Sequence, residues 1–428
     1  MDEITALAKR RGFIFQSSEI YGGVNGIWDY GPVGVEMKRN IREAWWRDVV
    51  ALRGDVVGIE SAIIMHADVW RASGHVDNFT DLMMDCKTCK KRFRADQIAG
   101  IRCPACGNAT LTAPRAFNLM FKTQLGAMED AASEAYLRPE TAQGMFVDFK
   151  LAYQAARKKP PFGIAQIGKA FRNEVTPGNF IFRSREFELM ELEYFVPPDP
   201  EEAGLRWHRY WVDQRYDWWL ALGVQAERLR KHEYAGADLA HYSRATTDIE
   251  YDYPFGWGEL EGIAHRGTFD LSQHVHASGK DLSFFDEETK TKYLPAVVEP
   301  ALGSDRALLV FLIDAYEKED DRTVLHLHPR LAPYKAAVFP LVRNKPEIVE
   351  LAAAIERDLR PRVRTTFDDS GNVGKRYYRQ DEIGTPFCIT IDYESLERQD
   401  VTVRDRDTKQ QERVAISRLE SYLGEKLR

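Results

Sequence analysis

The chain has 428 residues, of which 44% are hydrophobic and 29% are charged. This balance is typical of a folded globular protein and excludes a chain that is disordered throughout, and at about 150 residues per domain the length predicts roughly three units. The formal net charge of -7 gives no basic excess, so a nucleic-acid partner would need local basic patches.

The sequence gives no indication of a membrane. Its longest apolar runs, such as residues 307–313, are far shorter than the roughly 20 residues that span a bilayer. The residues that follow Met1 do not begin a signal peptide, so we expect a cytoplasmic protein. Five cysteines are too few for a disulfide scaffold in a chain of this length, which favours metal binding by the four that form two close pairs.

The N-terminal segment is predicted to be helical, with one strand. Residues 2–11 and 33–52 have helical periodicity, and in the second segment an apolar stripe of the kind found in a core or a dimer interface recurs every four residues. The stripe consists of Met37, Ile41, Trp45 and Val49. Pro32 suits the first position of that helix. Residues 58–65 are predicted to form a strand.

Residues 85–110 have the composition of an inserted module, because they are rich in Cys, Lys and Arg and poor in large aliphatic residues. Two C-x2-C pairs are separated by 13 residues; their members are Cys86, Cys89, Cys103 and Cys106. Four thiolates would form a closed, structural zinc site, and two local disulfides or four unligated thiols are the alternatives. Cys388 lies alone in a strand-like segment and is predicted to be a buried apolar residue rather than a nucleophile.

The middle of the chain predicts a largely antiparallel sheet. Residues 141–159 are predicted to be helical, and residues 162–167, 185–196 and 247–253 have the β-branched and aromatic content of strands. A helical segment, residues 197–223, contains Trp207, Trp211, Trp218 and Trp219. These rings could stack on bases, but tryptophans at helical spacing more often fill a core.

The C-terminal part is predicted to be a separate unit. Residues 317–333 have the composition of a linker, with a charged run followed by two prolines. After it, predicted strands alternate with predicted helices, which indicates an α/β domain of about 95 residues.

A hairpin with three arginines is the first candidate for chemistry. It contains FRNE (171–174) and RSREFEL (183–189), with Arg172, Arg183 and Arg185. These guanidinium groups either pair with the nearby acids or bind a polyphosphate, in which case Phe187 is suited to stack on a base. Spacing alone does not decide between the two. The nearby acids are Glu174, Glu186 and Glu188.

The segment EPALGSDR (299–306) is the second candidate, because it precedes an apolar helix. Gly303 permits a close approach of the backbone. Arg306 would lie in the first turn of the helix, where a positive charge is unfavourable unless an anion is present. The segment therefore predicts an anionic ligand.

Together these segments resemble a known family. Pro32 before a long helix, FRNE with RSREF, and EPALGSDR resemble the three signature motifs of class II aminoacyl-tRNA synthetases. Over nearly the whole chain, the sequence resembles the homodimeric type of glycyl-tRNA synthetase. The segments that carry this narrower resemblance are GFIFQSSEIYGG, WDYGPVG, SGHVDNFTD, RPETAQG, GELEGIAHRG, GTPFCITID and VTVRDRDT.

The resemblance implies a multidomain fold that combines α+β and α/β units. Residues 1–84 and 111–328 would form a class II catalytic domain on an antiparallel sheet, residues 85–110 a zinc-ribbon-like insertion, and residues 329–428 an α/β anticodon-binding domain. It also implies a homodimer that activates glycine with ATP and transfers it to the 3′ end of tRNA(Gly).

The resemblance implies an ATP site with Arg172 and Arg306 as catalytic residues. Arg172 would hold the α-phosphate and Glu174 the adenine amino group, while Phe187 and Arg306 would enclose adenine from its two faces. The predicted ATP-binding residues are Arg172, Asn173, Glu174, Phe182, Arg183, Ser184, Arg185, Glu186, Phe187, Glu259, Leu260, Gly303, Ser304, Asp305 and Arg306. Arg183 and Arg185 would meet the pyrophosphate, and Glu259 with Glu299 would bind Mg²⁺.

A site for glycine should be small, acidic and walled, because glycine has an ammonium group and no side chain. The resemblance implies that it is formed by Arg94, Glu140, Phe187, Glu188, Leu189, Met190, Glu191, Arg266, Glu299, Pro300, Ala301, Leu302 and Gly303. The family usually has Ser where this chain has Ala301, which predicts a weaker affinity for glycine.

Basic residues of the C-terminal domain are candidates for tRNA contacts or for solvated surface charges. They are Lys375, Arg376, Arg379, Arg404 and Arg406. The basic insertion would touch the acceptor stem or brace the catalytic domain. A non-catalytic paralogue is the main alternative to an enzyme, although the arginines expected to grip ATP are present.

Overall fold

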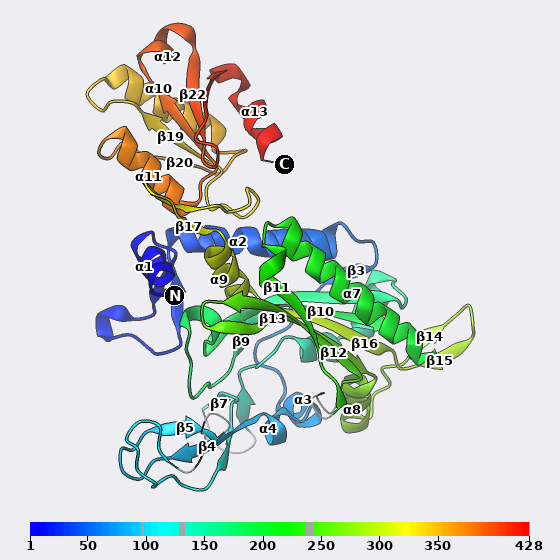
Figure 1. Cartoon of the computed structure of the whole chain (residues 1–428). Helices are drawn as coiled ribbons and strands as arrows, with labels where there is room; N and C mark the ends of the chain where they lie inside the picture. The colour runs from blue at the N-terminus through cyan, green and yellow to red at the C-terminus, as the bar shows by residue number, and fades with distance from the viewer. Residues whose placement is uncertain are drawn as a thin grey trace.

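The computed structural model describes residues 1–95, 98, 100, 102–127, 133–236, 239 and 243–427. It consists of a central sheet with helices, a small module on one side and a C-terminal domain on the other (Figure 1). The predicted domain ranges include some residues outside this set. They are 96, 97, 99 and 101 in the insertion, 128–132, 237, 238 and 240–242 in the catalytic domain, and 428.

The central sheet has seven strands in the order β11-β12-β13-β16-β10-β9-β3. Their bounds are β3 Val56–Gly58, β9 Phe162–Phe171, β10 Glu186–Val196, β11 Leu229–Glu233, β12 Ala245–Tyr253, β13 Gly256–Gly267 and β16 Ala296–Gly303. All neighbours pair antiparallel except β3 and β9. The predicted, largely antiparallel sheet is thus confirmed.

Helices cover both faces of this sheet. On one face, the main core joins residues of β10 to helices α1, α2, α7 and α9. On the other, a smaller core joins Phe195 of β10 to helices α5, α6 and α8. The bounds are α1 Asp2–Arg10, α2 Pro32–Trp46, α5 Ala142–Val147, α6 Phe149–Ala156, α7 Glu201–Ala221, α8 Phe269–Ser278 and α9 Ser304–Asp314. No helix in the described parts of the chain is long and apolar enough to cross a membrane.

The apolar stripe of residues 37–49 and the tryptophans of α7 belong to this core. Met37 and Ile41 are fully buried, and Pro32 is the first residue of α2 as predicted. Trp211, Trp218 and Trp219 are also buried in the main core. The prediction that the tryptophan cluster fills a core is therefore confirmed.

The strand predicted for residues 58–65 was wrong, because β3 ends at Gly58. The Trp46 ring lies so close to Gly58 that a Cβ there would meet it at 2.2 Å. Beyond this point Ile63 and Ile64 are both more than a third exposed. Residues 59–65 therefore form a loop, in which some of the apolar side chains that suggested a strand are partly exposed.

Short elements surround the sheet. N-terminal to it are β1 Ile14–Gln16, β2 Trp28–Tyr30, α3 Ala67–Ala72 and α4 His75–Asn78. The small module contains the sheet β5-β4-β6, and β7 pairs with β8 beside it. These strands are β4 Thr80–Asp85, β5 Arg92–Arg94, β6 Arg115–Asn118, β7 Lys122–Gln124 and β8 Glu134–Tyr136. A further hairpin consists of β14 Phe284–Asp286 and β15 Thr291–Tyr293.

The C-terminal domain has its own core and a five-stranded sheet in the order β20-β19-β21-β22-β23. Its elements are β19 Ala336–Pro340, α10 Pro346–Leu359, β20 Thr365–Phe367, α11 Val373–Ile383, β21 Phe387–Ile391, α12 Tyr393–Arg398, β22 Asp400–Asp405, β23 Gln411–Ala415 and α13 Leu419–Lys426. The expected linker instead begins with a hairpin of β17 Tyr316–Lys318 and β18 Thr323–Leu325. Cys388 is buried, and this burial raises the pKa of its thiol.

Candidate active site

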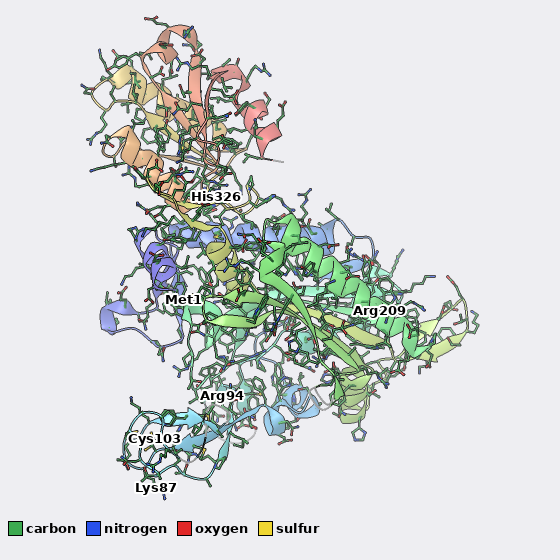
Figure 2. All side chains as sticks on the ribbon, in the orientation of Figure 1. Met1, Lys87, Arg94, Cys103, Arg209 and His326 are labelled. Carbon is green, nitrogen blue, oxygen red and sulfur yellow. The ribbon has the colours of Figure 1, made fainter. Side chains whose placement is uncertain are left out.

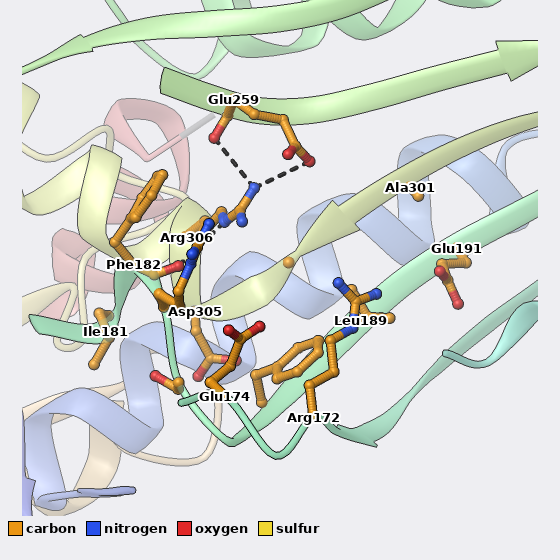
Figure 3. A pocket seen from close by; sticks show the side chains of 14 residues that line it. Arg172, Glu174, Ile181, Phe182, Leu189, Glu191, Glu259, Ala301, Asp305 and Arg306 are labelled. Carbon is orange, nitrogen blue, oxygen red and sulfur yellow. Dashed lines mark hydrogen bonds and ion pairs between the residues drawn. The ribbon is translucent and has the colours of Figure 1, made fainter. Parts of the chain in front are cut away.

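A cavity of about 240 Å³ opens on one face of the central sheet, over strands β10, β13 and β16 (Figure 3). It brings together residues from the hairpin between β9 and β10, from β13 and from the start of α9. The lining residues are Arg172, Glu174, Ile181, Phe182, Arg183, Ser184, Phe187, Leu189, Glu191, Glu259, Ala301, Gly303, Asp305 and Arg306. Two segments predicted to bind an anion, residues 171–189 and 299–306, therefore meet at one site.

Strand alternation decides which predicted residues reach this cavity. Successive side chains of a strand point to opposite faces, and on β10 Phe187, Leu189 and Glu191 line the cavity. Met190 is instead fully buried in the main core. The predicted residues that lie on the side of the sheet away from the cavity are Glu188, Met190, Leu260, Pro300 and Leu302.

Two arginines are held at the cavity by contacts within the chain. The Arg306 guanidinium lies 3.0 Å from a Glu259 carboxylate oxygen and 4.6 Å from the Phe182 ring centre (Figure 3). Arg172 donates to the Pro139 carbonyl at 3.1 Å and lies 5.2 Å from the Phe187 ring centre. Arg306 lowers the pKa of Glu259, so Glu259 supplies a negative charge of the kind expected beside Arg306.

The two remaining arginines of the hairpin, Arg183 and Arg185, differ in their contacts. Arg183 lines the cavity together with Ser184. Arg185 donates to the carbonyls of Asn25 and Glu174, both at 2.9 Å. Arg185 therefore ties the hairpin to the N-terminal loop. The sequence analysis had instead predicted that Arg185 contacts pyrophosphate. Glu186 pairs with Lys169 at 2.8 Å.

Buried carboxylates form the deep end of the site. Glu191 accepts hydrogen bonds from the amide and the hydroxyl of Thr141. Glu299 lies 2.7 Å from Arg266, which also binds Asp270 at 2.8 Å. The sequence analysis assigned no role to Thr141 or Asp270. Thr141 lies in the RPETAQG segment, and Asp270 lies in none of the named segments.

A second cavity, of about 290 Å³, adjoins the first and shares Arg172 with it. Here Glu140 lies 3.2 Å from His75. The lining residues are Ser73, Gly74, His75, Asn78, Phe79, Glu140, Arg172, Arg266 and Phe269. His75 was not among the predicted site residues, but it belongs to the SGHVDNFTD segment that the sequence did single out.

The carboxylates of this region have divergent pKa values. Burial raises the pKa of Glu299 to about 7, with Arg266 opposing the shift. Burial and the neighbouring Glu140 raise the pKa of Glu191. The pKa of Glu140 itself is lowered, because His75 and Arg266 outweigh the effect of burial. An ammonium group placed here would be stabilised by the ionised carboxylates.

Arg94 lies in the small module (Figure 2) and lines neither cavity. It belongs to β5, and its guanidinium is 3.3 Å from an Asp81 carboxylate oxygen. The sequence predicted a contact with glycine or phosphate, and the structure does not bring Arg94 together with the other predicted residues.

The four cysteines of the insertion meet as predicted, with their sulfur atoms all within 4.8 Å of one another. Cys86 and Cys106 are 3.7 Å apart, and Cys89 and Cys103 are 3.6 Å apart. A zinc tetrahedron with Zn–S bonds of about 2.3 Å requires sulfur separations of about 3.8 Å, whereas a disulfide is about 2.05 Å long. The geometry therefore fits a zinc site, and all four cysteines are free, so the two local disulfides are not formed.

Comparison with known proteins decides the family. The chain is 52% identical to the glycine–tRNA ligase of Clostridium beijerinckii, covering 99% of this chain and 97% of that protein. It is 50% identical to those of Streptomyces coelicolor and Geobacillus kaustophilus, which it matches over its whole length and over 98% and 99% of theirs. The chain belongs to the glycine–tRNA ligase family. Residues 335–426 match the family model of an anticodon binding domain.

The anticodon-binding domain of this glycine–tRNA ligase family member uses most of its predicted surface arginines internally. Arg376 is 1% exposed and donates to the backbone carbonyls of Asp369 and Gly371. Arg404 is buried and forms two hydrogen bonds with Asp381. The set of Arg376, Arg404 and Arg406, all buried, therefore does not form the expected positive surface.

The pair of carboxylates predicted to bind Mg²⁺ does not fit a shared ion. Glu299 is paired in register with Ala264 of β13, five residues from Glu259. At about 3.3 Å per residue, this spacing separates the backbone positions of the two glutamates by about 16 Å along the sheet. Glu259 lines the cavity, whereas Glu299 belongs to the acidic region beside Arg266.

Proposed function

We propose that this glycine–tRNA ligase family member activates glycine with ATP and transfers it to tRNA(Gly). The proposal is carried by one arrangement: a cavity with an aromatic ring and arginines at one end and the buried Glu191 carboxylate at the other. Such a site suits a polyanion at the first end and a small ammonium compound at the second. The identity of 50–52% over nearly the full length of the relatives supports the same substrates.

The seven-stranded antiparallel sheet is proposed to be a class II catalytic core. The meeting of residues 171–189 and 299–306 at one cavity, with the helix after Pro32 behind the sheet, supports this assignment. The proposed boundaries are residues 1–84 and 111–328 for the catalytic domain, 85–110 for the zinc-ribbon-like insertion and 329–428 for the anticodon-binding domain.

In the proposed activation step, Phe187 and Arg306 enclose adenine while Arg172 holds the α-phosphate. The glycine carboxylate attacks the α-phosphorus, the bond to the β-phosphate oxygen breaks, and pyrophosphate leaves. Arg183, which lines the cavity, is proposed to meet this leaving group. No protein nucleophile takes part, so the side chains act by positioning and by stabilising negative charge.

The glycine ammonium is proposed to lie by Glu191, with Glu140 and Glu299 nearby. The wall beside it contains Leu189 and Ala301, which line the cavity. A larger amino acid would need room that this wall occupies, so exclusion is steric. In the transfer step, a terminal ribose hydroxyl of tRNA attacks the carbonyl carbon of glycyl-adenylate, and AMP leaves.

Two metals are part of the proposal. Glu259, together with phosphate oxygens of ATP, would hold Mg²⁺, which neutralises phosphate charge when bound. Glu299 is not proposed as its ligand. The four cysteines of the insertion would hold a structural Zn²⁺. Metal analysis of the purified chain should find about one zinc per chain and much less in Cys103→Ser; zinc-free intact protein would remove this assignment.

The chain is also proposed to act in the cytoplasm as a homodimer. Sedimentation of the purified protein across a range of concentrations tests the oligomeric state. A sedimenting species of twice the chain mass is expected, and a monomer at micromolar concentration would contradict the proposal.

Charging of tRNA tests the complete function. Incubation with ATP, labelled glycine and a tRNA(Gly) transcript should attach label to the RNA, and the same reaction with tRNA(Ala) serves as the control. Labelling that needs neither ATP nor tRNA(Gly), or no labelling at all, would contradict the proposal; the second result would favour a non-catalytic paralogue.

A further inference from the structure

We propose that Lys38 is a positioning residue that fixes the two elements proposed to enclose adenine; this inference rests on the proposed function. Lys38 lies in α2, which packs on the sheet face opposite the cavity, and its side chain is only 9% exposed. No sequence motif singled it out. Its contacts nevertheless reach both β10 and α9.

The Lys38 ammonium is surrounded by three partners. It lies 2.9 Å from Asp305 Oδ1 and 3.7 Å from Glu188 Oε2, and it sits 4.2 Å from the centre of the Tyr30 ring. A buried ammonium without such partners would be strongly unfavourable. These contacts therefore hold the Lys38 side chain in one place.

Asp305 is the centre of this cluster. Its Oδ1 accepts hydrogen bonds from Lys38 and from the Tyr30 hydroxyl, and its Oδ2 accepts one from the Glu188 amide at 2.7 Å. Burial acts to raise the pKa of Asp305, but Lys38, Tyr30 and the amide outweigh it and lower the pKa. Both carboxylate oxygens are thus used inside the chain, so Asp305, predicted to bind ATP, is placed to act through its neighbours.

Glu188 completes the connection between the two elements. Its Oε2 also accepts a hydrogen bond from the Ser304 hydroxyl at 3.0 Å, and its Oε1 lies 3.6 Å from Arg42. Ser304 is the first residue of α9. The start of α9 is therefore tied to β10 by two separate groups, the Asp305 carboxylate and the Ser304 hydroxyl.

The residues proposed to hold adenine directly adjoin this cluster. Phe187 precedes Glu188 in β10, and Arg306 follows Asp305 in α9. Neighbouring side chains of a strand point to opposite faces, so the contacts behind the sheet fix the backbone that presents Phe187 to the cavity. Loss of Lys38 would leave the Asp305 and Glu188 carboxylates without the cation that they share and would so weaken the ties between α9 and β10. A displacement of about 1 Å in a positioned group can cost about 100-fold.

Binding of ATP, measured by titration calorimetry well below the melting temperature, tests this inference. For Lys38→Met we expect an ATP Kd at least tenfold above that of the wild type, because the spacing of Phe187 and Arg306 is no longer fixed. The glycine KM at saturating ATP should change less than twofold. Lys159→Met is the matched control: this lysine is 63% exposed and pairs with Glu288 at the surface, and its ATP Kd should equal that of the wild type.

Lys38→Met is expected to be less stable than the wild type, because Asp305 loses its cation, so a second and milder variant is needed. Tyr30→Phe keeps the Lys38–Asp305 pair and removes one hydrogen bond, so it should raise the ATP Kd about threefold, in line with a net worth of about 0.5–1.5 kcal/mol for one hydrogen bond. Wild-type ATP affinity in both folded variants would overturn the inference. A wild type that binds ATP without activating glycine would contradict the proposed function alone, and the comparison of Kd values would still decide the role of Lys38.

Discussion

Arg172 and Arg306, which line the proposed ATP cavity, can be compared with Arg376 and Arg404 in the C-terminal domain. All four come from segments rich in charge. The first two lie at the wall of a cavity. The other two are buried, and their guanidinium groups bind backbone carbonyls or a carboxylate within their own domain.

All four arginines have partners within the chain, so the difference teaches that an open cavity beside the guanidinium, rather than its charge or the presence of a partner, separates a ligand-binding role from a structural one. Arg306 keeps part of its guanidinium at a cavity that can admit a polyanion. Arg404 shares its buried carboxylate partner, Asp381, with Arg322, which lies 3.0 Å from the same carboxylate, so its guanidinium belongs to an internal ion-pair network. Variants of the two groups should therefore separate activity from stability.

The largest effect is expected for Arg306→Ala. ATP–pyrophosphate exchange should fall by about 10²-fold or more, because the guanidinium proposed to enclose one face of adenine is lost and ATP is no longer held in position. Arg306 is at the cavity surface, so the melting temperature should stay close to that of the wild type. Arg306→Lys, which keeps the charge without the planar fork, should recover part of the activity. Exchange at the wild-type rate in Arg306→Ala would break the comparison.

Arg404→Met should show the opposite result. Asp381 keeps Arg322 as a second cation at 3.0 Å, so the loss of the Arg404 hydrogen bonds should cost about 1.5–3 kcal/mol, and thermal unfolding of the C-terminal domain should occur at a lower temperature. Glycine-dependent exchange at 25 °C should stay within about twofold of the wild type, because the reaction takes place in the other domain. Lys375→Met, on an exposed position of α11, is the control for stability. Loss of exchange with an unchanged melting temperature would contradict this view.

The KM for glycine is expected to depend on pH, with an effect of intermediate size, because of the carboxyl groups at the acidic end of the cavity. Burial raises the pKa of Glu299 to about 7, so this carboxyl is ionised above that pH and neutral below it. The glycine KM should therefore rise about tenfold from pH 8 to pH 6, as the ammonium loses a charged partner. Glu299→Gln should have a flatter profile over this range. An equally steep profile in the variant would assign the effect to another group.

The same shift also predicts how Glu299 affects stability. Its pKa is higher in the folded chain than the value of about 4.3 in an unfolded one. Its contribution to the free energy of unfolding is therefore fully present below about pH 4 and is lost as the pH rises through about 7. Chemical denaturation of the wild type and of Glu299→Gln across this range measures the difference.

The smallest effect is expected for Ala301→Ser. A hydroxyl on this wall would add about one hydrogen bond, with a net value of about 1 kcal/mol. The glycine KM should fall about fivefold, and the ATP KM should stay unchanged. An unchanged glycine KM would remove the proposed link between Ala301 and a weaker affinity.

The sequence predicted the elements whose signals are local. The antiparallel sheet, the α2 core stripe and the meeting of four cysteines follow from residue periodicity and spacing. The sequence placed Glu188 and Leu189 in the same site, and only the strand alternation of β10 sends them to opposite faces. The structural roles of Lys38 and Arg404 could not be predicted from the sequence. Their partners, Asp305 and Asp381, lie on other elements, and no local sequence pattern indicates such a contact.

ATP–pyrophosphate exchange with each of the twenty amino acids in turn tests the central claim most directly. The proposed cavity, with a wall at Leu189 and Ala301 and carboxylates around the ammonium, predicts exchange with glycine and at least about 100-fold less with alanine or serine. Exchange with alanine or serine but not with glycine would contradict the account.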